Sequence, residues 1–382
     1  MNGCRERRIR VGVDAGDVRG GDNRAIQIAV DALGSAGGTV EVLPGEYICH
    51  DAVHLRSNIR LVGSGERTIL RNCDGFCSSV LTDADYGQYK VTPKDPRGFR
   101  EGMRIYVRDD KVGGWLESTA TIQRIENGVL YFDRHLMMDY KMSNNATVSN
   151  AGALISAIDA VDVRIENLVV DGNRNTHQKA GGCRVGGIYL HRVKRAQMTD
   201  LHVRDFAGDG ISFQITQDVS LSKVRASRCQ NYGVHPGTGS ARVRMIDCEF
   251  SDNDVGGYFL CWRVQEGTFQ RLRCERNGQF GISIGHKDTD NTFEDCILRD
   301  NGEAALVFRE EIDTNGAHRN TWRRCELAGS PTAVLGRAHA YDNVFENCRI
   351  GEGCGCAAVL PVGTKRFAFR DCTFLACVRD EA

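Results

Sequence analysis

Two adjoining stretches of sequence decide the fold: GIYLHRVKRAQMTDLHVRDFAGD (187–209) and GISFQITQDVSLSKVRASRCQNY (210–232). Both open with a short alternating strand. The pattern returns in GVHPGTGSARVRMIDCEFSDNDV (233–255), GYFLCWRVQEGTFQRLRCERNGQF (257–280) and GISIGHKDTDNTFEDCILRDNGEA (281–304). Units of 22 to 24 residues correspond to one solenoid turn of three short strands and three corners. The repeat therefore predicts an all-β chain folded as a right-handed parallel β-helix.

Side chains at every second position of these strands face the interior, because strand side chains have period two. A second interior ladder recurs once per coil, and Leu168 and Leu201 occupy the same slot upstream. The ladder consists of Cys248, Cys274, Cys296, Cys325, Cys348 and Cys372. Zinc sites need cysteines paired at two to four residues, so this spacing predicts free thiols packed as small hydrophobes. A third column, at the last corner, should adopt the left-handed conformation and stack its amides: Asn231, Asn253, Asn277 and Asn301.

Composition excludes several classes of partner. The 49 Lys and Arg residues balance 50 Asp and Glu residues, so no overall field favours nucleic acid or a membrane surface. No apolar run is long enough to span a bilayer. The opening MNGCRERRIRVGVDAG contains no apolar stretch of the kind found in secretory signals. We expect a cytoplasmic protein, with secretion as the alternative if a signal has been removed.

The N-terminal region reads as a cap on the solenoid. Asn23 is the expected N-cap of an amphipathic helix over Arg24–Leu33, and GSAGG ends it. A helix here would cover the apolar open end of the first coil. The segment GGDNRAIQIAVDALGSAGGTVEVLPGEY (20–47), followed by LRSNIRLVGSGERTIL (55–70), resembles the start of the pectate-lyase-like β-helix superfamily.

That resemblance implies the β-helix fold and a range of activities, since lyases, hydrolases, epimerases and phage tailspikes share it. It also suggests Ca²⁺, although no acidic cluster in the sequence forms an oxygen cage. Asp171-Gly172-Asn173 begins a corner and has oxygen ligands for an ion, but a simple turn is the favoured interpretation.

We expect a single β-helix domain over 1–382. Residues 12–45 form the cap and first strands, and 151–382 form regular coils. Between them, 84–150 loses the coil pattern and reads as a β-rich insertion with a hairpin at Asn127-Gly128. Inserted loops on solenoids often form one wall of a binding site, so we expect this one to lie over a face of the helix.

The candidate site is a stripe on the outer face. Stacked strands place outward residues in columns about 4.8 Å apart. One column is Tyr189, Ser212, His235, Phe259, Ser283 and Val307, and the next is His191, Gln214, Gly237, Cys261, Gly285 and Arg309. Just beyond them lie Trp262, His286, Lys287, Asp288, Glu310 and Glu311. The glycines leave room for a ligand, and the Trp262 ring suits stacking on a sugar. The plain alternative is an ordinary solvated surface.

This stripe predicts a carbohydrate-active enzyme acting on an acidic poly- or oligosaccharide. In β-elimination, Arg309 would neutralise the substrate carboxylate, Lys287 or His286 would take the C5 proton, and His235 would protonate the leaving oxygen. C5 epimerisation would reuse this set.

Two other functions stay open. Hydrolysis would use a carboxylate pair such as Asp288 and Glu310, with Asp209 as a third candidate. A non-catalytic alternative is a carbohydrate-binding or tailspike-like protein, monomeric or a homo-oligomer such as a trimer. The substrate contacts expected in every case are Gln214, Trp262, Asp209, Asp290 and Glu311.

Overall fold

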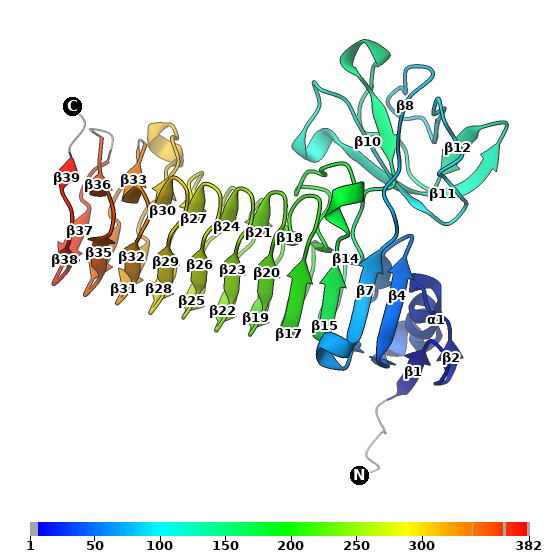
Figure 1. Cartoon of the computed structure of the whole chain (residues 1–382), viewed down its shortest axis with the longest axis horizontal. Helices are drawn as coiled ribbons and strands as arrows, with labels where there is room; N and C mark the ends of the chain where they lie inside the picture. Colours follow the sequence, from blue (N-terminus) through cyan, green and yellow to red (C-terminus); the bar gives the residue numbers. More distant parts are fainter. Residues whose placement is uncertain (1–6, 338, 362–363, 380–382) are drawn as a thin grey trace.

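A computed structural model describes residues 7–337, 339–361 and 364–379. The chain forms a right-handed parallel β-helix, and its coils follow one another in chain order along the long axis (Figure 1). The predicted fold class is thus confirmed. No helix within the described residues is both long and apolar enough to cross a membrane.

One face of the solenoid is an eleven-stranded parallel sheet, called the upper sheet here because it forms the upper row of strands in Figure 1. Its strands are β5 (Val53–Leu55), β14 (Ile155–Ile158), β16 (Ile188–His191), β18 (Ile211–Gln214), β21 (Tyr232–Gly237), β24 (Gly256–Phe259), β27 (Phe280–Ile284), β30 (Ala304–Phe308), β33 (Thr332–Gly336), β36 (Cys356–Val359) and β39 (Val378–Arg379).

The other faces belong to a twenty-two-stranded sheet. Its strands are β1 (Arg8–Gly12), β2 (Val18–Arg19), β3 (Gly38–Val42), β4 (Gly45–Cys49), β6 (Ile59–Val62), β7 (Thr68–Asn72), β15 (Val161–Asp171), β17 (Lys194–Arg204), β19 (Ser220–Ser222), β20 (Arg225–Ser227), β22 (Arg244–Ile246), β23 (Glu249–Ser251), β25 (Thr268–Gln270), β26 (Arg273–Glu275), β28 (Thr292–Glu294), β29 (Ile297–Arg299), β31 (Thr321–Arg323), β32 (Glu326–Ala328), β34 (Val344–Glu346), β35 (Arg349–Glu352), β37 (Ala368–Arg370) and β38 (Thr373–Phe374).

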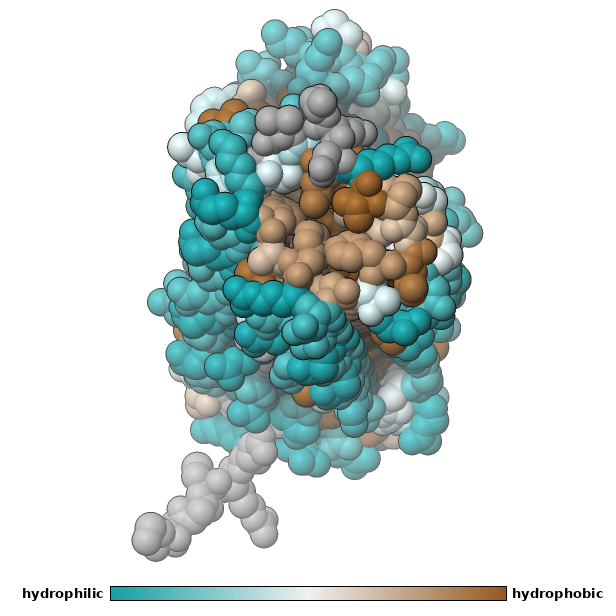
Figure 2. All heavy atoms as spheres, turned by 90° about the vertical axis from the view of Figure 1, so that its left-hand side faces the viewer, coloured by the Kyte–Doolittle hydropathy of each residue, from teal (hydrophilic) through white to brown (hydrophobic). Residues whose placement is uncertain are grey.

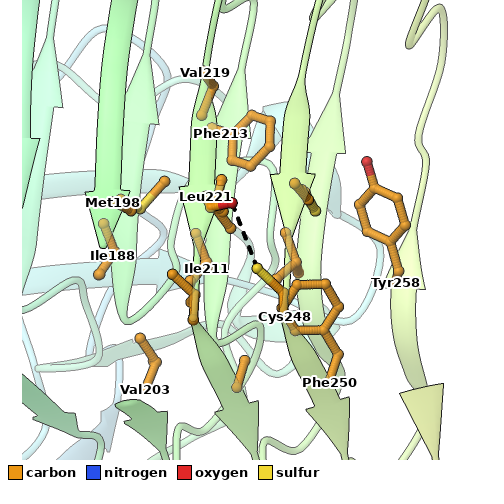
Figure 3. Close-up of a cluster of buried hydrophobic side chains, with 14 of the residues drawn as sticks. Ile188, Met198, Val203, Ile211, Phe213, Val219, Leu221, Cys248, Phe250 and Tyr258 are labelled. Carbon is orange, nitrogen blue, oxygen red and sulfur yellow. Dashed lines mark hydrogen bonds between the residues drawn. The ribbon is translucent and has the colours of Figure 1, made fainter. Parts of the chain in front are cut away.

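The interior is a continuous apolar core. Figure 3 shows side chains from successive coils stacked inside the helix, among them Ile211, Phe213 and Phe250. Cys248 belongs to this stack, and its thiol donates to the backbone carbonyl of Leu221 at 3.6 Å. The same bond to the preceding coil recurs at Cys296, Cys325, Cys348 and Cys372. These cysteines are free and burial raises the pKa of Cys248 to about 11, so the ladder packs as small hydrophobes that also satisfy carbonyls.

The corners carry two further ladders. Asn253, Asn277 and Asn301 are buried and hydrogen-bonded in series, with amide-to-amide distances of 3.0 Å. We expected the asparagine to be left-handed. The left-handed residue is instead the one before it, as at Arg276 with φ 54°. Asn231 departs from the series and donates to Asp209 instead.

Exposed corners pair an Asp of one coil with an Arg of the next through two hydrogen bonds, and both residues are left-handed. The pairs are Asp159–Arg192, Asp162–Arg195, Asp205–Arg228, Asp218–Arg242, Asp247–Arg271, Asp252–Arg276, Asp290–Arg319, Asp295–Arg324 and Asp342–Arg366. Each link joins only neighbouring coils, as expected of a solenoid.

The two ends of the solenoid differ. At the N-terminal end, α1 (Asn23–Leu33) buries Ile26 and Val30 against the first coil. Its N-cap is Asp22 rather than Asn23, because the Asp22 carboxylate accepts from the amides of the first turn. Figure 2 views the opposite end, where an apolar patch is ringed by hydrophilic residues. The exposed apolar residues of the last coil include Phe374, Leu375 and Val378.

A six-stranded antiparallel sheet stands above the first coils (Figure 1). It is referred to below as the insertion, residues 77–149, and it begins before the expected start at residue 84. Its strands are β8 (Cys77–Ser79), β9 (Lys90–Val91), β10 (Arg104–Arg108), β11 (Ser118–Glu126), β12 (Val129–Phe132) and β13 (Thr147–Ser149). The β11–β12 turn has positive φ at both Asn127 and Gly128, as a tight hairpin requires.

Short 3-10 turns punctuate the chain. They are η1 (Gly34–Ala36), η2 (Gly65–Arg67), η3 (Gly114–Leu116), η4 (Met142–Asn144), η5 (Arg174–Thr176) and η6 (Asp313–Asn315).

Candidate functional site

The predicted outward columns lie in register on the upper sheet. Tyr189 pairs with Ser212, and Ser212 with His235. These side chains are not solvated, however: Ser212 is 0% exposed and His235 is 4% exposed. The cause is the segment 178–187, which crosses this face and accepts a hydrogen bond from Ser212 Oγ at the carbonyl of Gly182. The stripe is therefore covered at the end that is earlier in the chain.

His235 and Asp209 form a buried ion pair. Nδ1 of His235 lies 2.6 Å from Oδ2 of Asp209, and Oδ1 of Asp209 accepts from the Asn231 side chain at 2.6 Å. Burial alone lowers the pKa of His235. The charge and hydrogen bond of Asp209, with a contribution from Cys261, outweigh burial and raise that pKa to about 10. His235 is consequently an imidazolium at neutral pH.

Other groups enclose the His235 ring. The rings of Tyr232 and Phe259 meet it edge-on, with centroids 5.7 Å and 5.2 Å away. A Cβ at Gly182 would lie 2.4 Å from Nδ1, so this position needs glycine. Nε2 is buried and has no acceptor at hydrogen-bond distance within the described chain. The expected role of His235 as an accessible proton donor does not fit this enclosure. Asp209 is fully buried, so its expected contact with substrate does not fit either.

The insertion reaches the covered end of the stripe. Nε1 of Trp115, in η3, donates to the Thr238 hydroxyl at 3.2 Å, and Arg184 donates to the Trp115 carbonyl at 2.5 Å. The Trp115 ring also lies 5.5 Å from that of His191. Gln214 is fully buried beneath this region, so it is not an exposed substrate contact either.

Arg309 and Asp288 form a second ion pair further along the stripe. Nη2 of Arg309 is 3.2 Å from Oδ2 of Asp288, and the guanidinium lies 4.5 Å from the Phe259 ring centroid. Asp288 is fully buried and also accepts from the amides of Val264 and Gly285. Burial raises the pKa of Asp288 to about 6, against the opposing effect of Arg309.

These contacts change two predicted roles. Asp288 is buried and paired with Arg309, so the carboxylate pair predicted with Glu310 does not fit this arrangement. The charge of Arg309 is already balanced by Asp288, which weakens its predicted role as the neutraliser of a substrate carboxylate.

The accessible part of the stripe is built on a corner. Left-handed residues follow the upper sheet on successive coils: Thr238 (φ 40°) is in register with Trp262 (φ 60°), and Arg263 (φ 64°) with Lys287 (φ 55°). Trp262 is 50% exposed there. One face of its ring stacks on His286, with centroids 4.6 Å apart. The corner thus displays a large aromatic surface beside an imidazole.

His286 is held by Glu311. Its Nδ1 lies 3.0 Å from Oε2 of Glu311, and the two side chains are 18% and 15% exposed. Nε2 makes no hydrogen bond to another described residue, which leaves it available to a ligand. A carboxylate on one ring nitrogen fixes the tautomer and lets the other nitrogen accept a proton.

The remaining predicted residues separate. Lys287 and Glu310 are exposed, and neither forms an ion pair within the residues that the structure describes. Lys287 follows His286 directly and is exposed at the same corner. Asp290 pairs with Arg319 in the Asp–Arg ladder, with distances of 2.8 Å and 2.7 Å. Its expected contact with substrate is therefore not supported.

The donor set does not fit calcium. Among the described residues, no three His, Cys, Asp or Glu side chains gather closely enough to hold a metal ion. Asp171 is bound to Arg204 at 3.0 Å and accepts from the amide of Asn173, which makes the DGN segment a turn. The described residues therefore supply no acidic cluster for the calcium that the superfamily resemblance suggests.

A second hollow, between the insertion and the first coils, escaped the sequence analysis. Its walls include Asp51, His54, Ser156, Arg134 and Arg184. His54 and Ser156 are 102 residues apart in sequence but adjacent in the upper sheet. His54 in β5 and Ser156 in β14 continue the outward column of Tyr189 toward the N-terminus. This column was not predicted to extend across the insertion.

Comparisons with known proteins agree with this architecture. The family model described as "Right handed beta helix region" matches residues 133–261 and 186–311. This match agrees with the right-handed parallel β-helix that the strands form. No curated protein sequence gives a significant match.

Solved structures show the same fold at low identity. The A-module of the Azotobacter vinelandii mannuronan C-5 epimerase AlgE4 aligns with a TM-score of 0.63 and 14% identity, covering 97% of each chain. The AlgE6 A-module from the same organism gives 0.53 and 16%, covering 94% of this chain and 77% of that one. The ORF18 protein of Geobacillus virus E2 gives 0.54 and 15%, covering 97% and 62%.

Proposed function

We propose that this β-helix is a carbohydrate-active enzyme that acts on an acidic poly- or oligosaccharide by removing the C5 proton of a uronate residue. The observation that carries the proposal is the corner of Trp262, His286, Lys287 and Glu311. It combines an aromatic surface, an oriented imidazole and an exposed cation on the outer face of a solenoid.

The chemistry of a uronate matches these groups. The C5 proton is acidic only when the adjacent carboxylate is neutralised, and the exposed Lys287 supplies that positive charge. Nε2 of His286 then takes the proton while Glu311 stabilises the resulting imidazolium. The free face of Trp262 supports the sugar ring. Expulsion of the 4-linked sugar completes elimination, whereas reprotonation from the opposite face completes epimerisation.

The similar structures are compatible with this reaction class, since two of them are mannuronan C-5 epimerases by name. Hydrolysis by two carboxylates has less support, because Asp288 is buried and bound to Arg309. Carbohydrate binding without turnover remains the second candidate, because the exposed Trp262 surface would serve it equally well.

A panel of polymannuronate, polyguluronate and polygalacturonate tests the proposal. Ultraviolet absorbance detects the unsaturated product of elimination, and proton NMR detects inversion at C5. One of these signals should appear with one polymer, and Lys287→Ala should lower kcat/KM for it. Arg263→Ala, which removes an exposed cation from the same corner column, is the control. New reducing ends without either signal would overturn the proposal in favour of hydrolysis. Binding without a product would favour a lectin-like role.

A further inference from the structure

The hollow beneath the insertion contains a serine, a histidine and an aspartate joined in series. Oγ of Ser156 lies 2.8 Å from Nδ1 of His54, and Nε2 of His54 lies 3.3 Å from Oδ2 of Asp51. The parallel register of β14 and β5 sets the first contact, because Ser156 and His54 are direct strand partners. This is the connectivity of an activated nucleophile: hydroxyl to one ring nitrogen and carboxylate to the other.

Asp51 is built to stay ionised. It is 9% exposed, its Oδ2 accepts from the Thr121 hydroxyl at 3.0 Å, and its Oδ1 accepts from the Ala52 amide at 2.8 Å. Burial raises its pKa, but the hydrogen bond and charge of His54 and the charge of Arg104 outweigh burial and hold that pKa below the usual range. The carboxylate therefore keeps a proton on Nε2 of His54 and leaves Nδ1 free to accept the Ser156 proton. Since Thr121 belongs to β11, the insertion completes this arrangement.

The walls of the hollow suit an anionic acyl ester. Arg134 and Arg184 line it and provide positive charge. Gly152 and Ala153 also line it, and their amide N–H groups bind no acceptor within the described residues. Free amides and guanidinium groups are the donors that stabilise the oxyanion of an acyl-transfer intermediate. Ala120 and Ile158 add apolar surface for a small acyl group.

We infer that Ser156, His54 and Asp51 form a second catalytic site that hydrolyses small acyl esters, such as acetyl esters, of anionic molecules. Oγ of Ser156 attacks the acyl carbonyl carbon while its proton passes to Nδ1 of His54. The tetrahedral intermediate collapses, the ester C–O bond breaks, and the leaving alkoxide takes that proton. Water then attacks the acyl-serine and gives a proton to Nδ1. The bond between the acyl carbon and Oγ breaks, Oγ takes the proton from Nδ1, and the carboxylic acid leaves. This inference does not depend on the uronate chemistry of the Trp262 corner.

Covalent trapping tests the nucleophile separately from turnover. A fluorophosphonate probe, followed by peptide mapping of the full chain, should form one adduct on Ser156. Ser156→Ala and His54→Gln should abolish that adduct. Ser222→Ala, at a serine on another face of the solenoid, should keep it. A folded wild-type chain that stays unlabelled, or is labelled elsewhere, would overturn the inference. Peptide mapping of the wild type decides the question even where Ser156→Ala fails to fold.

Ester hydrolysis tests the substrate class. The chain should hydrolyse 3-acetoxybenzoate, and Ser156→Ala should lower the rate by about 10²-fold or more. The anionic ester should have a higher kcat/KM than its neutral methyl ester, and Arg134→Ala should remove that preference. Equal rates for the two esters would contradict anion recognition. Uronate turnover should persist in Ser156→Ala, because the two sites are independent. Loss of ester hydrolysis in His286→Gln would contradict that independence.

Discussion

At the residue scale, the buried pair of His235 and Asp209 makes stability depend on pH in a defined direction. The folded pKa of His235, about 10, lies above its ordinary value of 6.5. Proton binding to His235 therefore stabilises the fold fully below pH 6.5, and this contribution disappears as the pH rises toward 10. Both side chains are buried under the segment 178–187. Removing one of them therefore tests the stability of the fold.

We expect Asp209→Asn to lower the free energy of unfolding by about 3–5 kcal/mol near neutral pH, because one partner of a buried ion pair is lost. The deficit relative to wild type should shrink as the pH approaches 10. Urea unfolding of both proteins at a series of pH values measures it, with Asp218→Asn at an exposed corner as the control. A deficit that stays constant with pH would contradict the protonated state of His235.

Glu311 orients His286, and its charge is expected to act in catalysis rather than in binding. Glu311→Gln keeps the shape of the side chain but removes the charge that stabilises the imidazolium. We expect kcat for uronate turnover to fall by about 10²-fold or more with little change in KM. Steady-state kinetics measure both parameters, with the exposed Glu266→Gln as the control. A rise in KM at unchanged kcat would show instead that Glu311 binds substrate.

At the element scale, the asparagine ladder ties each coil to the next. Asn277 accepts from the amide of Asn253 and donates to the carbonyl of Phe250, both inside the core. Asn277→Ala leaves these groups unsatisfied, at about 1–3 kcal/mol for each. Chemical denaturation should show the loss, while Gln270→Ala, at a side chain on the outer surface, should change stability little. Equal effects of the two substitutions would contradict a structural role for the buried ladder.

The strands and the interior ladders could be predicted from the sequence because they are periodic. The cysteine slot at Cys248 was interior for the reason expected, since Leu shares it on other coils. The corner assignments were less accurate. The left-handed conformation falls on Arg276 rather than Asn277, because the asparagine side chain must turn inward to bond its neighbours. Likewise, the N-cap is Asp22 and not the predicted Asn23. Both residue types suit an N-cap, and only the backbone geometry distinguishes them.

At the scale of the whole molecule, the site was harder to predict than the fold. The period-two pattern correctly places Ser212 and His235 outward, but the segment 178–187 covers them. No local sequence pattern predicts that contact. The Ser156–His54 contact was missed for a similar reason: the insertion separates the two strands that carry it. The proximity of Trp262 and His286 could be predicted because aromatic and ionisable residues are concentrated there in the sequence.

The insertion is held to the solenoid in part by Trp115. Trp115→Ala removes the hydrogen bond to Thr238 and the stacking of Arg184 on the indole. We expect faster amide hydrogen exchange in η3 and β11, with unchanged protection in the coils after residue 256. Tyr86→Ala, at an exposed ring elsewhere on the insertion, is the control. Unchanged exchange in the insertion would show that Trp115 does not anchor it.

Isotope exchange tests whether His286 removes the C5 proton of a uronate on the outer face. The chain is incubated with an acidic polysaccharide in D₂O, and deuterium at C5 is measured by NMR. We predict deuterium incorporation by the wild type and by His318→Gln, a histidine stacked on Tyr341 in a different environment. His286→Gln should bind the polymer without exchange. Exchange that persists in His286→Gln, or binding by the wild type without exchange for every uronate polymer, would contradict the claim.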